Sequence, residues 1–97
     1  MVGWFQGRME FGPRALGARC ILADPRDPKA AERLNSAIKK REAFRPFAPA
    51  VLEEEAEKWF PGATTSPYMS ITVTVAEDCK SSIPAVVAAD GTARIQT

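Results

Sequence analysis

The chain has 97 residues, of which 45% are hydrophobic and 26% are charged, and its formal net charge is +1. This length and composition favour one globular domain with a modest core and exclude a disordered or low-complexity protein. No apolar run reaches the roughly 20 residues that a membrane-spanning helix needs, and the N-terminus has no secretion-signal pattern. We therefore expect a cytoplasmic protein without a membrane partner.

The chemistry open to the chain is limited by its metal-binding and acid–base residues. It contains two cysteines, Cys20 and Cys79, and no histidine. Because Cys and His supply most zinc ligands, we expect no metal site here, and we expect both thiols to be reduced. The commonest general base at neutral pH is missing. Acid–base chemistry would need Asp, Glu, Lys or Tyr, or a group on another domain.

Positive charge is concentrated in the first half of the chain. Residues 8–45 carry ten bases and five acids, whereas the other residues carry three bases and seven acids. Arginine-rich loops favour phosphate or carboxylate ligands. A helix with a mixed surface charge explains the same imbalance without a ligand, and charge alone favours that explanation.

Two short apolar runs at the start of the chain, Val2–Gln6 and Arg19–Ala23, are predicted to form strands. The loop between them places Arg14 between Gly12 and Gly17, a composition that indicates a fixed backbone shape around a charged side chain.

A helix is predicted next, over Pro28–Ala43. Asp27 is a good N-cap, and proline suits the first helical position. Four residues recur at helical spacing and define the expected buried face: Ala31, Leu34, Ile38 and Arg41. Before this helix, Asp24 and Arg26 are expected to fix the turn.

The second half is predicted to alternate extended and helical segments. Prolines exclude a helix over Phe44–Leu52, and Glu53–Phe60 is predicted to be a short helix. Ser66–Asp78 alternates apolar and polar residues, which predicts a half-buried strand. Asp90-Gly91 predicts a hairpin between two further strands.

Arg94 lies between Ala93 and Ile95 in the last predicted strand, so it should face the opposite side of the sheet. The chain ends within this strand pattern, and we expect a fragment cut from a longer protein. An alternative is a short protein whose open strand edges pair with a second copy.

Four motifs carry a family resemblance, "GRMEFGPRALGARCILADPR", "LNSAIKKREAFRPFAP", "SPYM" and "IPAVVAADGTARIQT". Together they closely resemble the C-terminal domain of the O-carbamoyltransferases of nodulation and antibiotic biosynthesis. The resemblance runs over nearly the whole of residues 1–97. It implies an α/β, α+β-like fold with an open twisted mixed sheet and two helices, similar to YrdC/Sua5 proteins, of which this chain holds the first part.

The resemblance also implies a function. The domain would bind ATP, with Mg²⁺ on its phosphates, and carbamoyl phosphate, and would form carbamoyl adenylate. A Kae1-like N-terminal domain, which carries a metal in this family, would be its partner and would pass the carbamoyl group to a hydroxyl of a small molecule. This part alone is expected to be inactive.

The site residues implied by the resemblance are Lys39, Arg45 and Arg94, expected as the catalytic group. Lys39 and Arg45 would hold phosphate, and Arg94 phosphate or the carbamoyl oxygen. Arg14 and Arg41 are further candidates for binding the cofactor. Adenylate formation requires neutralisation of a triphosphate and orientation of the attacking oxygen, which fixed cations supply without histidine.

Several alternatives stay open. Arg14 could reach the phosphate or carbamoyl group, face the transferase domain, or pair with Glu10. The chain has Val87–Ala89 where the family often has a histidine before Asp-Gly, and Ala18-Arg19-Cys20 where the family often has Asn or His and then Arg-Ser. Five aromatic residues are expected in the core rather than stacked on adenine: Trp4, Phe44, Phe47, Trp59 and Tyr68. Of these, Tyr68 follows Pro67 and is expected to be exposed enough for stacking on adenine to be tested.

A different class of function is a nucleotide- or RNA-binding module without catalysis. The resemblance favours small-molecule ligands over nucleic acid, and RNA binding should weaken steeply with salt.

Overall fold

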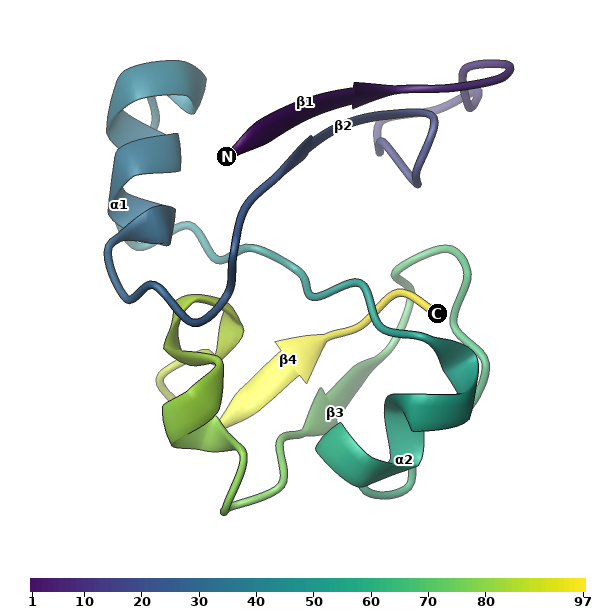
Figure 1. Cartoon of the computed structure of the whole chain (residues 1–97), viewed down its shortest axis with the longest axis vertical. Coiled ribbons are helices and arrows are strands. Elements are labelled where there is room, and N and C mark those ends of the chain that lie inside the picture. The colour runs from purple at the N-terminus through teal and green to yellow at the C-terminus, as the bar shows by residue number, and fades with distance from the viewer.

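Four short strands pair into two separate antiparallel sheets in the computed structural model, which describes all residues 1–97. β1 (Val2–Phe5) pairs with β2 (Arg19–Leu22). β3 (Thr72–Thr74) pairs with β4 (Thr92–Arg94). Figure 1 shows the β1–β2 hairpin at one end of the molecule and the β3–β4 sheet at the other, with the middle of the chain running between them. The mixed α/β class is confirmed.

The single open sheet expected from the sequence is wrong. The extended segment before α2 meets the end of β4 through one parallel bridge, between Ala50 and Gln96. The N–H of Val51 donates to the Gln96 carbonyl at 3.0 Å, and the N–H of Gln96 donates to the Pro49 carbonyl at 3.0 Å. Pro46 and Pro49 have no N–H of their own, so this segment cannot build a longer ladder.

The first helix is shorter than predicted. α1 (Ala30–Arg33) continues directly as the π-helix η1 (Leu34–Lys39), and Lys40, at φ 48°, ends it in the left-handed region. The predicted N-cap is wrong, because the helix begins at Ala30 with Lys29 as its N-cap. Asp27 lies in the turn before it, where its carboxylate accepts the N–H of Lys29 at 2.9 Å. The predicted end at Ala43 is wrong, because the chain turns away at Lys40.

The buried face of this helix also differs from the prediction. Ala30, Leu34 and Asn35 are buried, whereas Ile38 is 44% exposed. The wider π-helical turn changes which side chains point inward, and a periodicity of 3.6 residues cannot anticipate it.

The second predicted helix is confirmed. η2 (Glu53–Glu55) leads into α2 (Ala56–Trp59), and the helix ends before Pro61-Gly62. The N–H of Gly62 donates to the carboxylate of Glu57 at 3.0 Å, which closes this end.

β3 is shorter than the predicted strand, although the alternation holds: Thr72 and Thr74 are exposed, whereas Val75 is buried. The segment before Asp90-Gly91 is not a strand. It forms two 3-10 turns, η3 (Lys80–Ser82) and η4 (Pro84–Val86).

The hairpin predicted around Asp90-Gly91 is therefore wrong, and only its turn is confirmed. Within that turn the N–H of Ala88 donates to the Thr92 carbonyl at 2.8 Å. Pro84 lacks the N–H that a ladder needs, so β4 finds its partner in β3.

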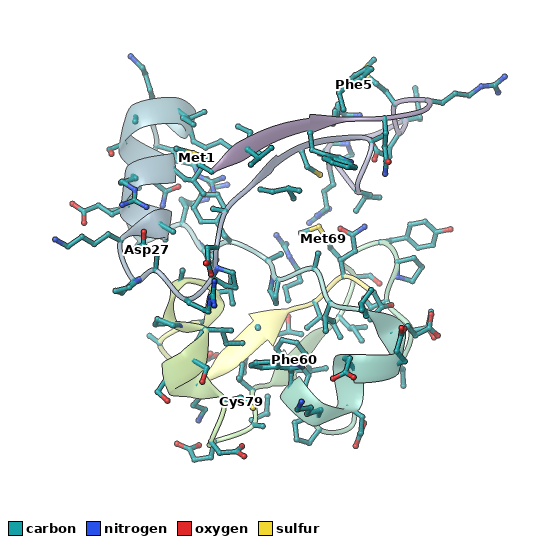
Figure 2. The ribbon with its side chains drawn as sticks, in the orientation of Figure 1. Met1, Phe5, Asp27, Phe60, Met69 and Cys79 are labelled. Atoms are coloured by element: carbon teal, nitrogen blue, oxygen red, sulfur yellow. The ribbon has the colours of Figure 1, made fainter.

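One core cluster lies between α2, η4 and the β3–β4 sheet. Its members are Phe60, Val75, Ile83, Val86, Ala93 and Ile95. Figure 2 shows Phe60 inside this cluster and Phe5 on the outer hairpin. Phe47 and Trp59 pack against it, as expected, but Trp4, Phe44 and Tyr68 are exposed, so their predicted core position is wrong.

The state of the cysteines follows the sequence expectation. Cys20 and Cys79 are free thiols. None of the helices has both the length and the apolar character that crossing a membrane requires.

Two phenylalanines provide a matched test of the core, because Phe60 is 1% exposed and Phe44 is 81% exposed. We expect Phe60→Ala to lower the free energy of unfolding by about 3–5 kcal/mol, through lost burial and the cavity left behind. Phe44→Ala should change it by about 0.5 kcal/mol or less. Urea denaturation measures both. Equal losses would contradict the position of the core.

Candidate anion-binding site

The loop between β1 and β2 is organised by Glu10. Its Oε1 accepts the N–H groups of Leu16 at 3.0 Å and Ala18 at 2.6 Å. Its Oε2 lies 3.2 Å from Nη1 of Arg19, and Arg19 also donates to the carbonyls of Glu10 and Gly12. These bonds, led by that from Ala18, lower the pKa of the Glu10 carboxyl. The predicted alternative in which Glu10 pairs with Arg14 is therefore wrong.

Two glycines allow this loop to fold back. Gly12 (φ 129°) and Gly17 (φ 119°) both occupy conformations that side chains disfavour. The returning loop is tied to the far end of the chain, because Nε2 of Gln96 donates to the Leu16 carbonyl at 2.8 Å. Arg14, between the two glycines, is thereby placed over the end of β4.

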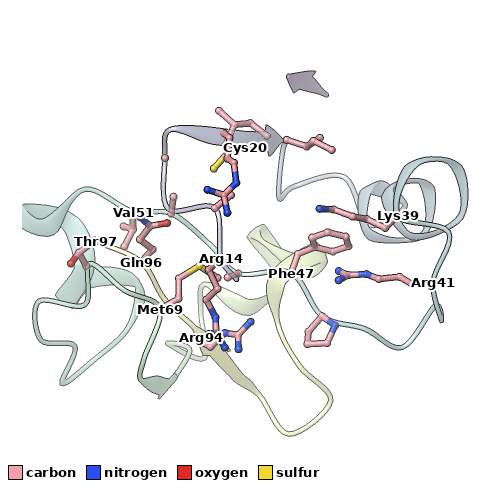
Figure 3. A pocket seen from close by; sticks show the side chains of 18 residues that line it. Arg14, Cys20, Lys39, Arg41, Phe47, Val51, Met69, Arg94, Gln96 and Thr97 are labelled. Atoms are coloured by element: carbon pink, nitrogen blue, oxygen red, sulfur yellow. The ribbon is translucent and has the colours of Figure 1, made fainter. Parts of the chain in front are cut away.

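A pocket of about 520 Å³ lies where this loop, β2, the end of η1 and the residues around the end of β4 come together. Figure 3 shows Arg14 and Arg94 projecting toward its centre, with Lys39, Arg41 and Phe47 on one side. No carboxylate side chain lines it. Five cations do: Arg14, Arg19, Lys39, Arg41 and Arg94.

An adjoining pocket of about 350 Å³ contains Arg45. The two pockets share Arg41, Pro46, Phe47 and Arg94, and the second also lacks a carboxylate side chain. The structure thus brings Lys39 and Arg94 together in the first pocket and Arg45 and Arg94 together in the second. The predicted group of three lies across two adjoining pockets.

Four of these cations have no ion pair in the structure: Arg14, Lys39, Arg41 and Arg94. Arg45 makes only a long contact, 3.9 Å to Glu42, between exposed side chains. Such cations keep their charge and their hydrogen-bond donors available for an anion.

Elsewhere in this half of the chain, Asp24 and Asp27 each pair with an arginine. Arg26 donates to Asp24 through its backbone N–H and its guanidinium, and this lowers the pKa of Asp24 to about 2. The pair forms the turn before the helix, as predicted. Asp27 pairs with Arg33 on the helix. The absence of carboxylates is therefore local to the pockets.

Sequence reasoning missed the roles of two polar residues that hold the site: Asn35, and Glu10, which was expected only as a possible partner of Arg14. Asn35 is buried, and its Oδ1 accepts Nε of Arg41 at 2.7 Å. The available signal was a polar residue directly after Leu34 in a predicted helix with an apolar face. If such a residue is buried, its polar atoms need hydrogen-bond partners. No cluster of three or more His, Cys, Asp or Glu side chains that could hold a metal ion occurs in the structure.

Chemically, the two pockets offer fixed positive charge to an anion larger than a single carboxylate. Guanidinium groups bind phosphate through two parallel hydrogen bonds, and lysine acts as a point charge. Neither pocket supplies a carboxylate side chain as a base, so the arrangement suits neutralisation and orientation of phosphates.

Comparison with known proteins identifies relatives along the whole chain. Residues 1–97 match the family described as carbamoyltransferase C-terminus. The chain is 50% identical to nodulation protein NolO of Bradyrhizobium diazoefficiens, covering 100% of this chain and 18% of that protein. It is 52% identical to nodulation protein NolNO of Sinorhizobium fredii, covering 100% of this chain and 15% of that protein. Nodulation protein U of Azorhizobium caulinodans is 46% identical, over 99% of this chain and 17% of that protein. The chain therefore spans less than a fifth of these relatives.

The lowered pKa of Glu10 gives a pH-dependent prediction. A lowered folded pKa means that these hydrogen bonds stabilise the loop fully above the ordinary value of 4.5 and are lost as pH falls through the folded value. We expect the amide resonances of Leu16 and Ala18 to titrate with an apparent pKa below 4.5 in an NMR pH series.

Two variants control this titration. Glu10→Gln keeps an acceptor oxygen but cannot titrate, so the pH-dependent shift should disappear. Glu54→Gln changes a carboxylate that makes no ion pair in the structure and should leave the shift unchanged. A transition at or above the ordinary carboxyl pKa would contradict the arrangement around Glu10.

Proposed function

Because this chain belongs to the carbamoyltransferase family and corresponds to its C-terminal part, we propose that it is the part of an O-carbamoyltransferase that binds ATP and carbamoyl phosphate. In the proposed reaction it forms carbamoyl adenylate, and the rest of the longer protein passes the carbamoyl group to a hydroxyl of a small molecule. We also propose that the complete domain has a fold similar to that of YrdC proteins.

One observation carries the proposal. Four cations without ion pairs, Arg14, Lys39, Arg41 and Arg94, line a pocket that has no carboxylate side chain. Bringing them together opposes folding through repulsion, so their arrangement is explained best by an anion that binds there. A triphosphate supplies several negative charges in one flexible ligand.

The proposed roles follow the two pockets. Lys39 and Arg94 contact phosphate in the first pocket, and Arg45 contacts phosphate in the second. Arg94 lines both pockets, so it can bridge a phosphate and the carbamoyl oxygen. Its direction is fixed, because it is the last residue of β4 and lies between the buried residues Ala93 and Ile95.

In the proposed chemistry the protein forms no covalent bond to either substrate. Water first cleaves carbamoyl phosphate into carbamate and inorganic phosphate, and a proton is released. An oxygen of the carbamate then bonds to the α-phosphorus of ATP, the bond from the α-phosphorus to the bridging oxygen of the β-phosphate breaks, and pyrophosphate leaves. The cations hold both anions in position and stabilise the charge on the departing pyrophosphate. Mg²⁺ would reach the site on the phosphates, because no carboxylate side chain lines it.

The proposal is tested by measuring the binding of ATP with Mg²⁺ to this chain by isothermal titration calorimetry. Arg94→Ala should weaken binding by tenfold or more, since hydrogen bonds to charged groups contribute about 1.5–3 kcal/mol. Arg94→Lys should recover only part of this loss, because lysine cannot make the bidentate contact. Lys29→Ala changes an exposed cation that lines neither pocket and should bind as the parent chain does.

Two results would argue against the proposal. Unchanged ATP affinity in Arg94→Ala would remove the proposed site. Tight binding of mixed-sequence RNA that falls steeply with salt would favour the nucleic-acid alternative instead.

In the longer protein, Arg94→Ala should also abolish exchange of labelled pyrophosphate into ATP that depends on carbamoyl phosphate.

A further inference from the structure

The side chain of Asn35 uses its full set of polar atoms in the interior. It is 1% exposed. Its amide nitrogen donates to the carbonyls of Ala43 at 3.3 Å and Arg45 at 3.0 Å, and its Oδ1 accepts Nε of Arg41 at 2.7 Å. Three points of the segment that follows the helix are thus held by one amide group.

The backbone of Asn35 extends this control. Its carbonyl accepts the N–H of Lys40, and the N–H of Arg41 at 3.0 Å, which closes the π-helical turn. Single π-helical turns are concentrated at functional sites. Here the turn sends the chain from Lys39, at the first pocket, to Arg45, at the second.

Arg41 is oriented without being neutralised. Its Nε is bound to Asn35, and its guanidinium carbon lies 4.8 Å from the centre of the Phe47 ring. Its Nη1 and Nη2 make no hydrogen bond or ion pair within the chain. Stacking and the Nε bond fix the plane of the guanidinium, so the edge that carries the two terminal amino groups stays available. Arg41 lines both pockets.

We infer that Arg41 is an anion ligand shared by the two pockets and that the buried amide of Asn35 is its positioning residue. This inference rests on the proposed function, because it places two phosphate-bearing ligands side by side with Arg41 between them. A cation in that position reduces the repulsion between the two anions. Asn35 contacts neither anion and acts through Arg41.

The choice of an amide at residue 35 follows from this role. An aspartate could also accept Nε of Arg41, but its charge would offset that of the guanidinium. It would also set a carboxylate against the carbonyls of Ala43 and Arg45, which now accept hydrogen bonds. A neutral amide orients Arg41 and leaves its charge for the ligand.

Titration of the 97-residue chain with ATP and Mg²⁺ tests the inference through two readouts. The first is affinity by calorimetry, and the second is the Nε–Hε resonance of Arg41 by NMR. In the parent chain we expect a distinct Hε signal, displaced from that of a free arginine, which shifts again on binding. Arg41→Gln should weaken binding by about tenfold, equivalent to about 1.4 kcal/mol.

Variants of Asn35 separate positioning from folding. Asn35→Ala should weaken binding severalfold and return the Arg41 Hε signal to that of a free arginine. Asn35→Asp should keep the displaced Hε signal and still weaken binding, because the new charge competes with the anion. Ser36→Ala alters the neighbouring exposed side chain, which bonds to the Glu32 carbonyl at 2.9 Å, and should change neither readout.

The outcomes distinguish this inference from the proposed function. Weak binding by Arg94→Ala together with normal binding by Arg41→Gln would overturn the inference and leave the proposed function standing. Normal binding by both variants, or no binding by the parent chain, would overturn both. Normal binding by Asn35→Ala with weak binding by Arg41→Gln would overturn the positioning role. If both Asn35 variants lose the dispersed spectra of a folded protein, the parent chain decides. An Arg41 Hε signal of the parent chain that does not shift when ATP binds would overturn the inference.

Discussion

Repulsion between like charges is the constraint on which the arrangement of this domain depends. Four cations without carboxylate partners surround one pocket: Arg14, Lys39, Arg41 and Arg94. Their repulsion opposes the folded state and is strongest where salt screens it least. Carboxylates would relieve it but would also occupy the donors that a ligand needs. The fold therefore holds these side chains by neutral groups and backbone geometry.

Three parts of the chain meet this constraint in different ways. Glu10 holds the Arg14 loop through backbone N–H groups, and Arg19 takes up its charge. Asn35 orients Arg41 with an amide. Pairing of β3 with β4 fixes Arg94 on the face opposite the core. The cluster of cations thus lowers the free energy of unfolding, as is common where function and stability compete.

Sequence reasoning succeeded where local signals decide the structure. Short apolar runs predicted β1 and β2, and prolines predicted the extended segment before α2. The position of Arg94 between Ala93 and Ile95 predicted that its side chain points away from the core. It failed where a distant partner decides. Asn35 lies directly after Leu34, but a polar residue is normally assigned to the surface, so its burial and the π-helical turn around it were missed. Phe44 shows the reverse error, because an apolar residue is not buried unless another element covers it.

The site was predicted in part for the same reason. Family resemblance singled out Lys39, Arg45 and Arg94, but only the structure divides them between two pockets. Arg14 reaches the first pocket because Gln96 bonds to Leu16 across most of the chain. β1 and β2 bury no side chain of their own, so few apolar contacts fix the hairpin and its loop over β4. An anion that contacts Arg14 and Arg94 together therefore adds to that attachment, and ligand binding stabilises the arrangement that creates its site.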